Sequence, residues 1–312
     1  MRRGAALGPP FALTFAILMS CGFPGSDDDT GSQSSAWMAA LDGRSSLAEL
    51  LPATERDAAT YASPRRPHEP SGGPNEPAGF VPIAQSAKGG AGRTTGAWRI
   101  WSGEDNVEVK EDPEAPASGG FHRYRYPEGL PPGRGPMGES GWSEPPVNAL
   151  EIYFTMWYRL VDTGRGNWES HEVMTKQGFF GVGNCGGTNE AYFSIQGGIR
   201  SSFDLRFHQQ GPVASRSIAP LRGNVIRVGE WHRIEMHARV NDLGRRNGLL
   251  RIWVDNRLVL RERDVVWRNR EHDCGFRRWV WNPTWGGMGG EPRSRDDFVD
   301  IAHVYISAPP DL

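Results

Sequence analysis

Alternation of apolar and polar residues is the feature that most restricts the fold of this chain. In residues 149–161 (ALEIYFTMWYRLV), every second side chain from Leu150 to Leu160 is apolar, and the positions between them carry polar or amphipathic side chains. The same period of two recurs in residues 190–196, 202–208 and 231–240. Successive side chains of a β-strand point to opposite faces, so this pattern predicts strands that bury one face only.

Two further segments extend the β-pattern toward the C-terminus. Residues 251–260 (RIWVDNRLVL) read as two short strands joined by a turn at Asp255 and Asn256, and residues 298–307 predict a last strand. The chain also has 40 Gly and 24 Pro among 312 residues, which disfavours a mostly helical protein. We therefore expect an all-β fold, an antiparallel β-sandwich or jelly roll.

The first 20 residues have the layout of an export signal. Arg2 and Arg3 precede an apolar stretch at residues 11–19, which is far shorter than the roughly 20 residues of a membrane span. The stretch ends at residues 18–21 (LMSC), which resemble the signal of bacterial lipoproteins. We expect residues 1–20 to be a signal peptide and Cys21 to carry a lipid that anchors an exported protein to the membrane, in the periplasm or at the cell surface. An ordinary signal peptide is the alternative.

Composition divides the mature chain into a tether and one domain. Residues 21–92 are rich in Gly, Pro, Ser and Ala, most densely at 63–79 (SPRRPHEPSGGPNEPAG), and predict a low-complexity, disordered linker. Residues 93–312 hold the alternating segments and predict the folded domain. The chain has 35 basic and 37 acidic residues, a net charge of −2, so no general attraction to nucleic acid is expected.

The three cysteines fit an exported protein. If Cys21 carries lipid, Cys185 and Cys274 remain as a candidate disulfide, because exported proteins meet oxidising conditions. Two unpaired thiols are the alternative.

One stretch resembles a known superfamily. Residues 229–260 read GEWHRIEMHARVNDLGRRNGLLRIWVDNRLVL, in which Trp231 and His232 open a strand, Asn241 lies in the next loop and residues 253–255 (WVD) lead into a hairpin turn. This pattern resembles the concanavalin A-like superfamily, particularly its polysaccharide lyase-like branch of alginate and glucuronan lyases. Asn256 replaces the usual turn glycine, and asparagine tolerates the positive φ that the turn requires.

Two weaker matches extend the resemblance to about residues 145–308. Residues 285–287 (WGG), followed by Asp300, resemble the end of the family's domain, and residues 176–181 (KQGFFG) lie where the branch often carries a Lys-x-x-G segment. These motifs are mainly structural. The resemblance implies a jelly roll that engages polysaccharide, and β-elimination as the family's chemistry.

Several predicted strands have one apolar face and an opposite face that carries aromatic, Arg, His and Gln side chains. Such a face suits a glycan groove, because arginine binds carboxylates in a bidentate manner and aromatic faces pack on sugar rings. The alternative is a solvated sheet face with ion pairs such as Arg233 with Glu235. The glycan-binding candidates are Tyr153, Trp157, Gln196, Trp231, Glu235, His237 and Arg239.

β-Elimination from a uronic-acid polymer requires a cation at the carboxylate, a base and an acid. The candidates for the cation are Lys176, Arg206 and Arg233. Those for the base are His208, His237 and Lys176, and those for the acid are Tyr192 and Tyr153. Lys176 stands out because it is one of two lysines in residues 93–312.

Other functions fit the residues less well or remain open. No strand carries the closely spaced carboxylates of a glycoside hydrolase, so hydrolysis is disfavoured. We expect no cofactor and no metal, because the acidic turn at residues 295–300 matches no defined calcium loop. A non-catalytic carbohydrate-binding protein or a structural surface lipoprotein is the alternative to a lyase. The lyase hypothesis requires Lys176, Tyr192, His208 and Arg233 to meet in one cleft.

Overall fold

The computed structural model describes residues 70–311, apart from residues 91, 117–118, 143–147, 165–167, 170, 172–174, 184–189, 200–201 and 287–288. The expected signal peptide, Cys21, Cys185 and most of the expected tether lie outside the described residues. Within the described part of the chain, no helix is long and apolar enough to cross a bilayer.

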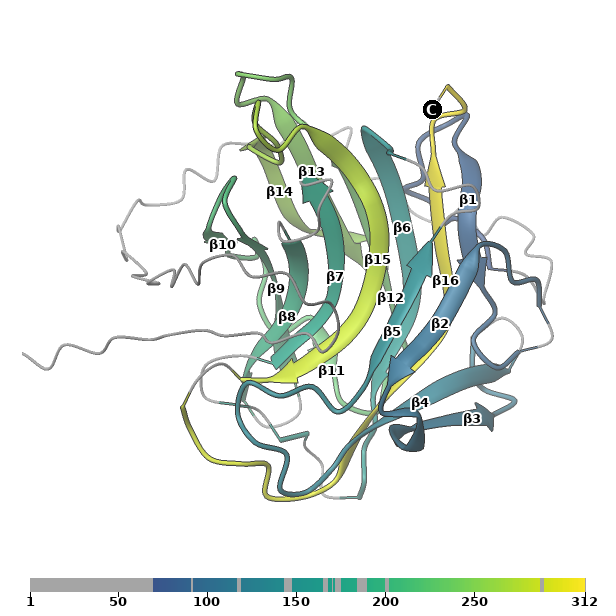
Figure 1. The fold of residues 1–312 in the computed structure, drawn as a ribbon. Helices are drawn as coiled ribbons and strands as arrows, with labels where there is room; N and C mark the ends of the chain where they lie inside the picture. The colour runs from purple at the N-terminus through teal and green to yellow at the C-terminus, as the bar shows by residue number, and fades with distance from the viewer. Residues whose placement is uncertain are drawn as a thin grey trace, which may run out of the picture. The chain divides into compact units, whose positions relative to one another are not determined.

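The domain consists of two antiparallel sheets of eight strands each (Figure 1). Sheet A has the order β14 (Arg257–Val265), β13 (Gly248–Val254), β12 (His232–Arg239), β6 (Glu151–Leu160), β16 (Asp297–Ala308), β4 (Gly120–Tyr126) and β3 (Val107–Glu111), with β1 (Val81–Ser86) also paired to β16. Sheet B has the order β10 (Arg216–Ile218), β9 (Ser202–Gln210), β8 (Glu190–Ile199), β7 (Thr175–Gly183), β15 (Cys274–Trp285), β5 (Gly138–Trp142) and β2 (Ala97–Ser102), with β11 (Ile226–Arg227) paired to β9.

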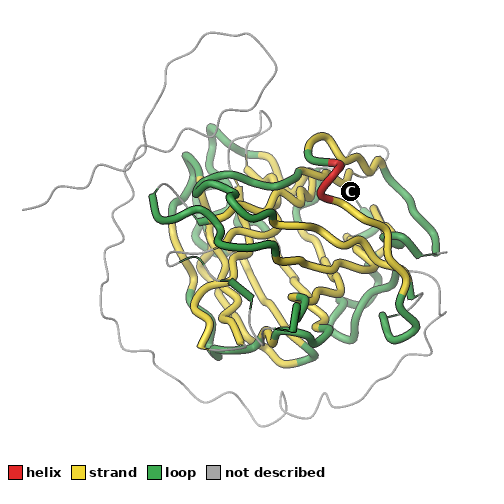
Figure 2. Tube along the Cα trace, turned by 90° about the horizontal axis from the view of Figure 1, so that it is seen from below, coloured by secondary structure: helices red, strands yellow, loops and turns green. Residues whose placement is uncertain are grey.

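The expected all-β sandwich is confirmed. Among the described residues the helical content is the short 3-10 turn η2 (Glu104–Asn106), drawn red among the yellow strands of Figure 2. The predicted alternating segments become β6, β8, β9 and β12. The predicted hairpin joins β13 to β14, and its turn residues Asp255 and Asn256 have φ of 50° and 69°, as a tight hairpin turn requires.

The core lies between the two sheets and is formed by the inward face of each strand. In β6 the side chains of alternate positions from Ile152 to Leu160 are buried in it. Phe154 contacts Phe180 of sheet B, with ring centroids 5.1 Å apart, and stacks on Trp279 at 5.9 Å. The period of two thus assigned the core face of β6 correctly from Ile152 to Leu160. Leu150, which the pattern also placed on this face, precedes the strand and is 47% exposed.

The folded domain begins earlier than the sequence predicts. Val81 to Ser86 of β1 pair with β16, although they belong to the stretch expected to be a tether. Lys88, in the same stretch, is buried and forms an ion pair with Glu139 of β5. Composition does not reveal this boundary, because the short strand β1 is held by backbone pairing with β16 and has no regular pattern of apolar residues.

Candidate functional site

The outer face of β7, β8 and β9 in sheet B brings together most of the residues predicted to act in catalysis. The pairing register places Lys176, Ser194 and Arg206 side by side across the three strands. In the neighbouring row, Tyr192 of β8 lies directly opposite His208 of β9. Because side chains alternate along a strand, both rows point away from the core.

Direct contacts join these side chains into one cluster. The rings of Tyr192 and His208 stack with centroids 4.9 Å apart. The Lys176 ammonium lies 4.9 Å from the Tyr192 ring and donates a hydrogen bond of 3.2 Å to Gln210 Oε1. His208 Nε2 and Ser194 Oγ are 2.7 Å apart. We call these five residues the Lys176–His208 cluster.

A β-bulge follows Lys176 in β7. The register between β7 and β8 shifts between Lys176 and Phe179, so β7 holds one residue more than its partner there. Gln177, the next residue after Lys176, is buried in the core, where the hydroxyls of Tyr126 and Tyr158 each donate to its Oε1 at 3.2 Å. Neither the bulge nor these hydrogen bonds could be predicted from the alternation of apolar and polar residues.

The cluster is strongly buried. Lys176, Tyr192 and His208 are 5%, 3% and 4% exposed, whereas Gln210 of the cluster is half-buried, as are Arg206 and Gln196 beside it. Burial, together with the positive charges of Lys176 and Arg206, lowers the pKa of His208 from 6.5 to about 4. The imidazole is therefore neutral throughout the neutral and mildly acidic range.

This lowered pKa predicts a loss of stability in acid. Between pH 6.5 and about 4 the unfolded chain binds a proton on His208 that the folded chain does not, so the free energy of unfolding falls as the pH falls through this range. The contribution is complete above pH 6.5, and its loss amounts to up to about 3 kcal/mol. Urea unfolding across this range is expected to show a smaller decrease for His208→Gln than for the wild type. An equal decrease in both would show that His208 is not the group responsible.

The other predicted residues lie on the outer face of sheet A. Tyr153 and Glu235 are fully buried there, and the Tyr153 hydroxyl donates to Glu235 Oε2 at 2.7 Å. Arg233 Nε donates to the other oxygen of Glu235 at 3.0 Å. The preceding chain segment covers them: the backbone N–H of Asn75 donates to Glu235 at 3.1 Å, and Phe80 contacts the ring of His237. The Arg233–Glu235 ion pair of the alternative interpretation is therefore present, but this part of the face is buried and not solvated.

Two tryptophans extend this face of sheet A. Trp157 and Trp231 are partly buried against Phe121 and its neighbours. The guanidinium of Arg159 lies 4.5 Å from the Trp231 ring, and that of Arg233 lies 5.7 Å from the Trp157 ring. Arg239, at the end of β12, is exposed.

The condition that Lys176, Tyr192, His208 and Arg233 meet in one cleft is therefore not met, because Arg233 lies apart from the other three. Lys176, Tyr192, His208 and Arg206 come together in sheet B with Gln196 one row away, but Arg233 lies in sheet A with the remaining candidates. The reason is that β6 pairs with β12, whereas β8 pairs with β9, and the two pairs belong to opposite sheets. Ser194 and Gln210, which contact His208 and Lys176, were not among the candidates, although their positions in the alternation placed them on the same face.

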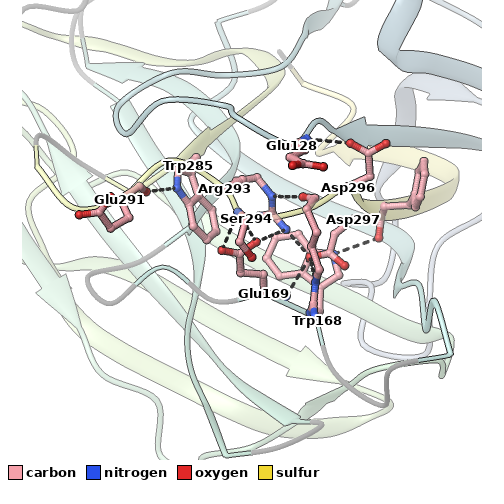
Figure 3. Close-up of polar contacts among 11 residues, drawn as sticks. Glu128, Trp168, Glu169, Trp285, Glu291, Arg293, Ser294, Asp296 and Asp297 are labelled. Carbon is pink, nitrogen blue, oxygen red and sulfur yellow. Dashed lines mark hydrogen bonds and ion pairs between the residues drawn. The ribbon is translucent and has the colours of Figure 1, made fainter.

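The acidic turn before β16 is neutralised by arginines. Arg293 forms an ion pair with Asp297, and its guanidinium lies 4.3 Å from the Trp285 ring and 4.6 Å from that of Trp168 (Figure 3). Further along the strand, Asp300 accepts hydrogen bonds from Arg123 and Arg159. No group of three or more His, Cys, Asp or Glu side chains with metal-binding geometry occurs among the described residues.

The cysteines are only partly within the described residues. Cys274, at the start of β15, is 6% exposed and is disulfide-bonded. Because Cys21 and Cys185 both lie outside the described residues, the pairing of Cys274 with Cys185 stays a prediction.

Comparison with solved structures identifies the type of fold. The structure is similar to that of the marine PL-14 alginate lyase from Aplysia kurodai, with a TM-score of 0.51 and 13% sequence identity, over 67% of this chain and 90% of the other. The domain therefore shares the jelly-roll fold of this lyase. This confirms the fold that the sequence resemblance implied. No family model matches the sequence, and no curated protein matches it.

More distant likenesses to this jelly roll include two further lyases. The endo-β-1,4-glucuronan lyase from the fungus Trichoderma reesei is 15% identical, over 73% of this chain and 96% of the other, with a TM-score of 0.48. The alginate lyase from Chlorella virus is 14% identical, over 65% and 88%, with a TM-score of 0.46. At such identities the comparison concerns the fold of the jelly roll, and its chemistry has to be argued from its own residues.

Proposed function

We propose that the jelly roll is a polysaccharide lyase that cleaves a uronic-acid-containing polymer by β-elimination on the outer face of β7, β8 and β9. The observation that carries the proposal is the Lys176–His208 cluster, in which a cation, a neutral imidazole and a phenol are in contact, with Arg206 in the same row as Lys176 and Ser194. These are the group types that the reaction needs.

Each group has a definite role in the proposed reaction. Arg206 and Lys176 neutralise the uronate carboxylate and so make the C5 proton more acidic. Neutral His208 removes that proton, the bond from C4 to the glycosidic oxygen breaks as the C4–C5 double bond forms, and Tyr192 protonates the leaving oxygen. The low pKa of His208 keeps the base unprotonated in mild acid, although it also weakens the driving force for proton transfer. The sequence-based hypothesis required Arg233 in the same cleft, but Arg233 lies in sheet A, so the present proposal departs from it and gives the cation role to Arg206 and Lys176. His237 and Tyr153 also lie in sheet A and have no part in this step.

The proposal is tested by incubating the purified protein with alginate, polyglucuronate and heparin and following the ultraviolet absorbance of the unsaturated product. We expect product with at least one polymer. A neutral β-glucan, which has no carboxylate and therefore no acidified C5 proton, is the matched negative substrate. The absence of unsaturated product from all three polyuronates would exclude the lyase.

The near-complete burial of the cluster favours a second candidate, a non-catalytic carbohydrate-binding protein. In that case the half-buried Arg206, Gln196 and Gln210 bind the polymer and the buried groups only support the sheet. Binding of a polyuronate without any cleavage would identify this function.

We further propose that the protein is exported and anchored to the membrane by a lipid on Cys21. The support is the signal-like sequence of residues 1–21. Cys21→Ser is expected to move the protein from the membrane fraction to the soluble fraction, because serine lacks the thiol to which the lipid is attached. Fractionation of producing cells, with immunodetection, measures this. Unchanged membrane retention of the Cys21→Ser variant would contradict the anchor.

A further inference from the structure

The outer face of sheet B changes its charge from one row of side chains to the next. Lys176 and Arg206 stand in one row with Ser194, and in the next row Gln196 of β8 lies directly opposite Asp204 of β9. The chain neighbours of Asp204 and of Arg206 are buried in the core, so both charged side chains point outward. Alternate residues of a strand are about 7 Å apart, so a carboxylate lies one such step from the arginine.

The Asp204 carboxylate is held in place by the loop before β11. The backbone N–H of Asn224 donates to Asp204 Oδ1 at 2.7 Å, and Asn224 has a φ of 53°, which asparagine tolerates. A Cβ at Gly223 would lie only 2.8 Å from the same oxygen, so the absence of a side chain there lets the loop approach closely. The carboxylate therefore has a fixed position on this face, where it stays partly exposed.

Asp204 neutralises Arg206 only in part. Arg206 Nη2 and Asp204 Oδ2 are 3.8 Å apart, which is a long ion pair between two partly exposed side chains. Arg206 Nε is buried and has no hydrogen-bond partner among the described residues. The arginine thus keeps a donor for a carboxylate of a ligand, whereas Asp204 repels a second negative charge that is brought to the same part of the face.

We propose that Asp204 is a specificity-determining residue, which makes the site prefer a polymer of alternating uronate and uncharged sugars over a polymer of uronates alone. This preference rests on the proposed function, in which Lys176 and Arg206 hold the carboxylate of the reacting uronate. In a homopolyuronate the neighbouring sugars carry carboxylates too, and one that lies over Gln196 and Asp204 meets a like charge. An uncharged sugar there offers hydroxyl or amide groups, which the Gln196 amide binds.

The test is Asp204→Asn, which removes the charge and keeps an acceptor for the N–H of Asn224. The substrates are polyglucuronate, in which every sugar is a uronate, and hyaluronan, in which glucuronate alternates with uncharged N-acetylglucosamine. We expect kcat/KM for polyglucuronate to rise about three- to tenfold, through KM, and that for hyaluronan to change by less than about twofold. Salt screens the repulsion, so the gain is expected to shrink at high salt.

Asp264→Asn is the matched control, because Asp264 is exposed on β14 of sheet A and its substitution changes the net charge equally. An equal gain in this control would show a general charge effect and overturn the proposal. Should Asp204→Asn not fold, Gln196→Glu decides, because it adds a carboxylate to the same row. A selective loss of kcat/KM for polyglucuronate in Gln196→Glu supports the proposal, and an equal loss for both polymers overturns it.

Binding separates the specificity role of Asp204 from the proposed lyase. If neither polymer yields unsaturated product, the lyase proposal fails, and retardation in native gels containing each polymer measures the affinity instead. A selective gain in affinity of Asp204→Asn for polyglucuronate then supports the specificity role, and an unchanged affinity overturns it. Product formation with an unchanged ratio of the two kcat/KM values in Asp204→Asn overturns the specificity role and leaves the lyase standing.

Discussion

His208→Ala is expected to lower kcat for cleavage of a polyuronate by about 10²–10⁴-fold, with KM little changed. In the proposed reaction the imidazole removes the C5 proton, whereas Arg206 and Lys176 supply much of the attraction for the substrate. The His208 side chain contacts Ser194 at 2.7 Å and stacks on Tyr192. Because its contacts are with protein groups and its proposed role is proton removal, we expect its loss to lower kcat more than substrate affinity. Initial rates of unsaturated-product formation measure the effect.

The matched control is His272→Ala, because His272 lies in the loop before β15 and is no part of the cluster. We expect it to retain the wild-type kcat. Lys176→Ala is expected to reduce kcat as well, and the double variant with His208→Ala to lose much less than the product of the two effects, because groups that act together are not additive. A kcat within a few-fold of the wild type in His208→Ala would remove His208 from the mechanism.

Lys88→Met is expected to lower the free energy of unfolding by about 3–5 kcal/mol. Lys88 and Glu139 are 1% and 3% exposed and form an ion pair, and the Tyr124 hydroxyl donates to Glu139 at 2.7 Å. Burial lowers the pKa of Lys88, and the charge of Glu139 opposes that shift. Removing the lysine leaves the buried Glu139 carboxylate without a cation, and an uncompensated buried charge destabilises the folded state.

The double variant Lys88→Met/Glu139→Gln is expected to recover most of this loss, because it removes both charges and keeps an acceptor for Tyr124. Lys110→Met is the control, since Lys110 forms an exposed pair with Glu108 and its loss is expected to cost well under 1 kcal/mol. Denaturant unfolding compares the four proteins. If Lys88→Met were as stable as the wild type, the pair would contribute nothing to the fold.

Several parts of the site were predictable and others were not. The alternation of β8 and β9 placed Tyr192, Ser194, Arg206 and His208 on outward faces, because in a strand the face of a residue follows from its position alone. The burial of Glu235 was not predictable, because the residue that covers it, Asn75, comes from a segment with the composition of a linker. The bulge after Lys176 was also hidden, because it arises from the mismatch of two paired strands.

By itself, the sequence determined the all-β class, the inward and outward faces of the long strands, and the hairpin at Asp255 and Asn256. These features depend on local geometry, namely the period of two and the positive φ that asparagine and aspartate tolerate. Only the tertiary structure decided which strands share a sheet. Both sheets of a sandwich show the same alternation, so the pattern could not tell that Arg233 lies in one sheet and His208 in the other. Strand pairing, which brings together residues far apart in the chain, therefore divided the candidate residues between the two sheets.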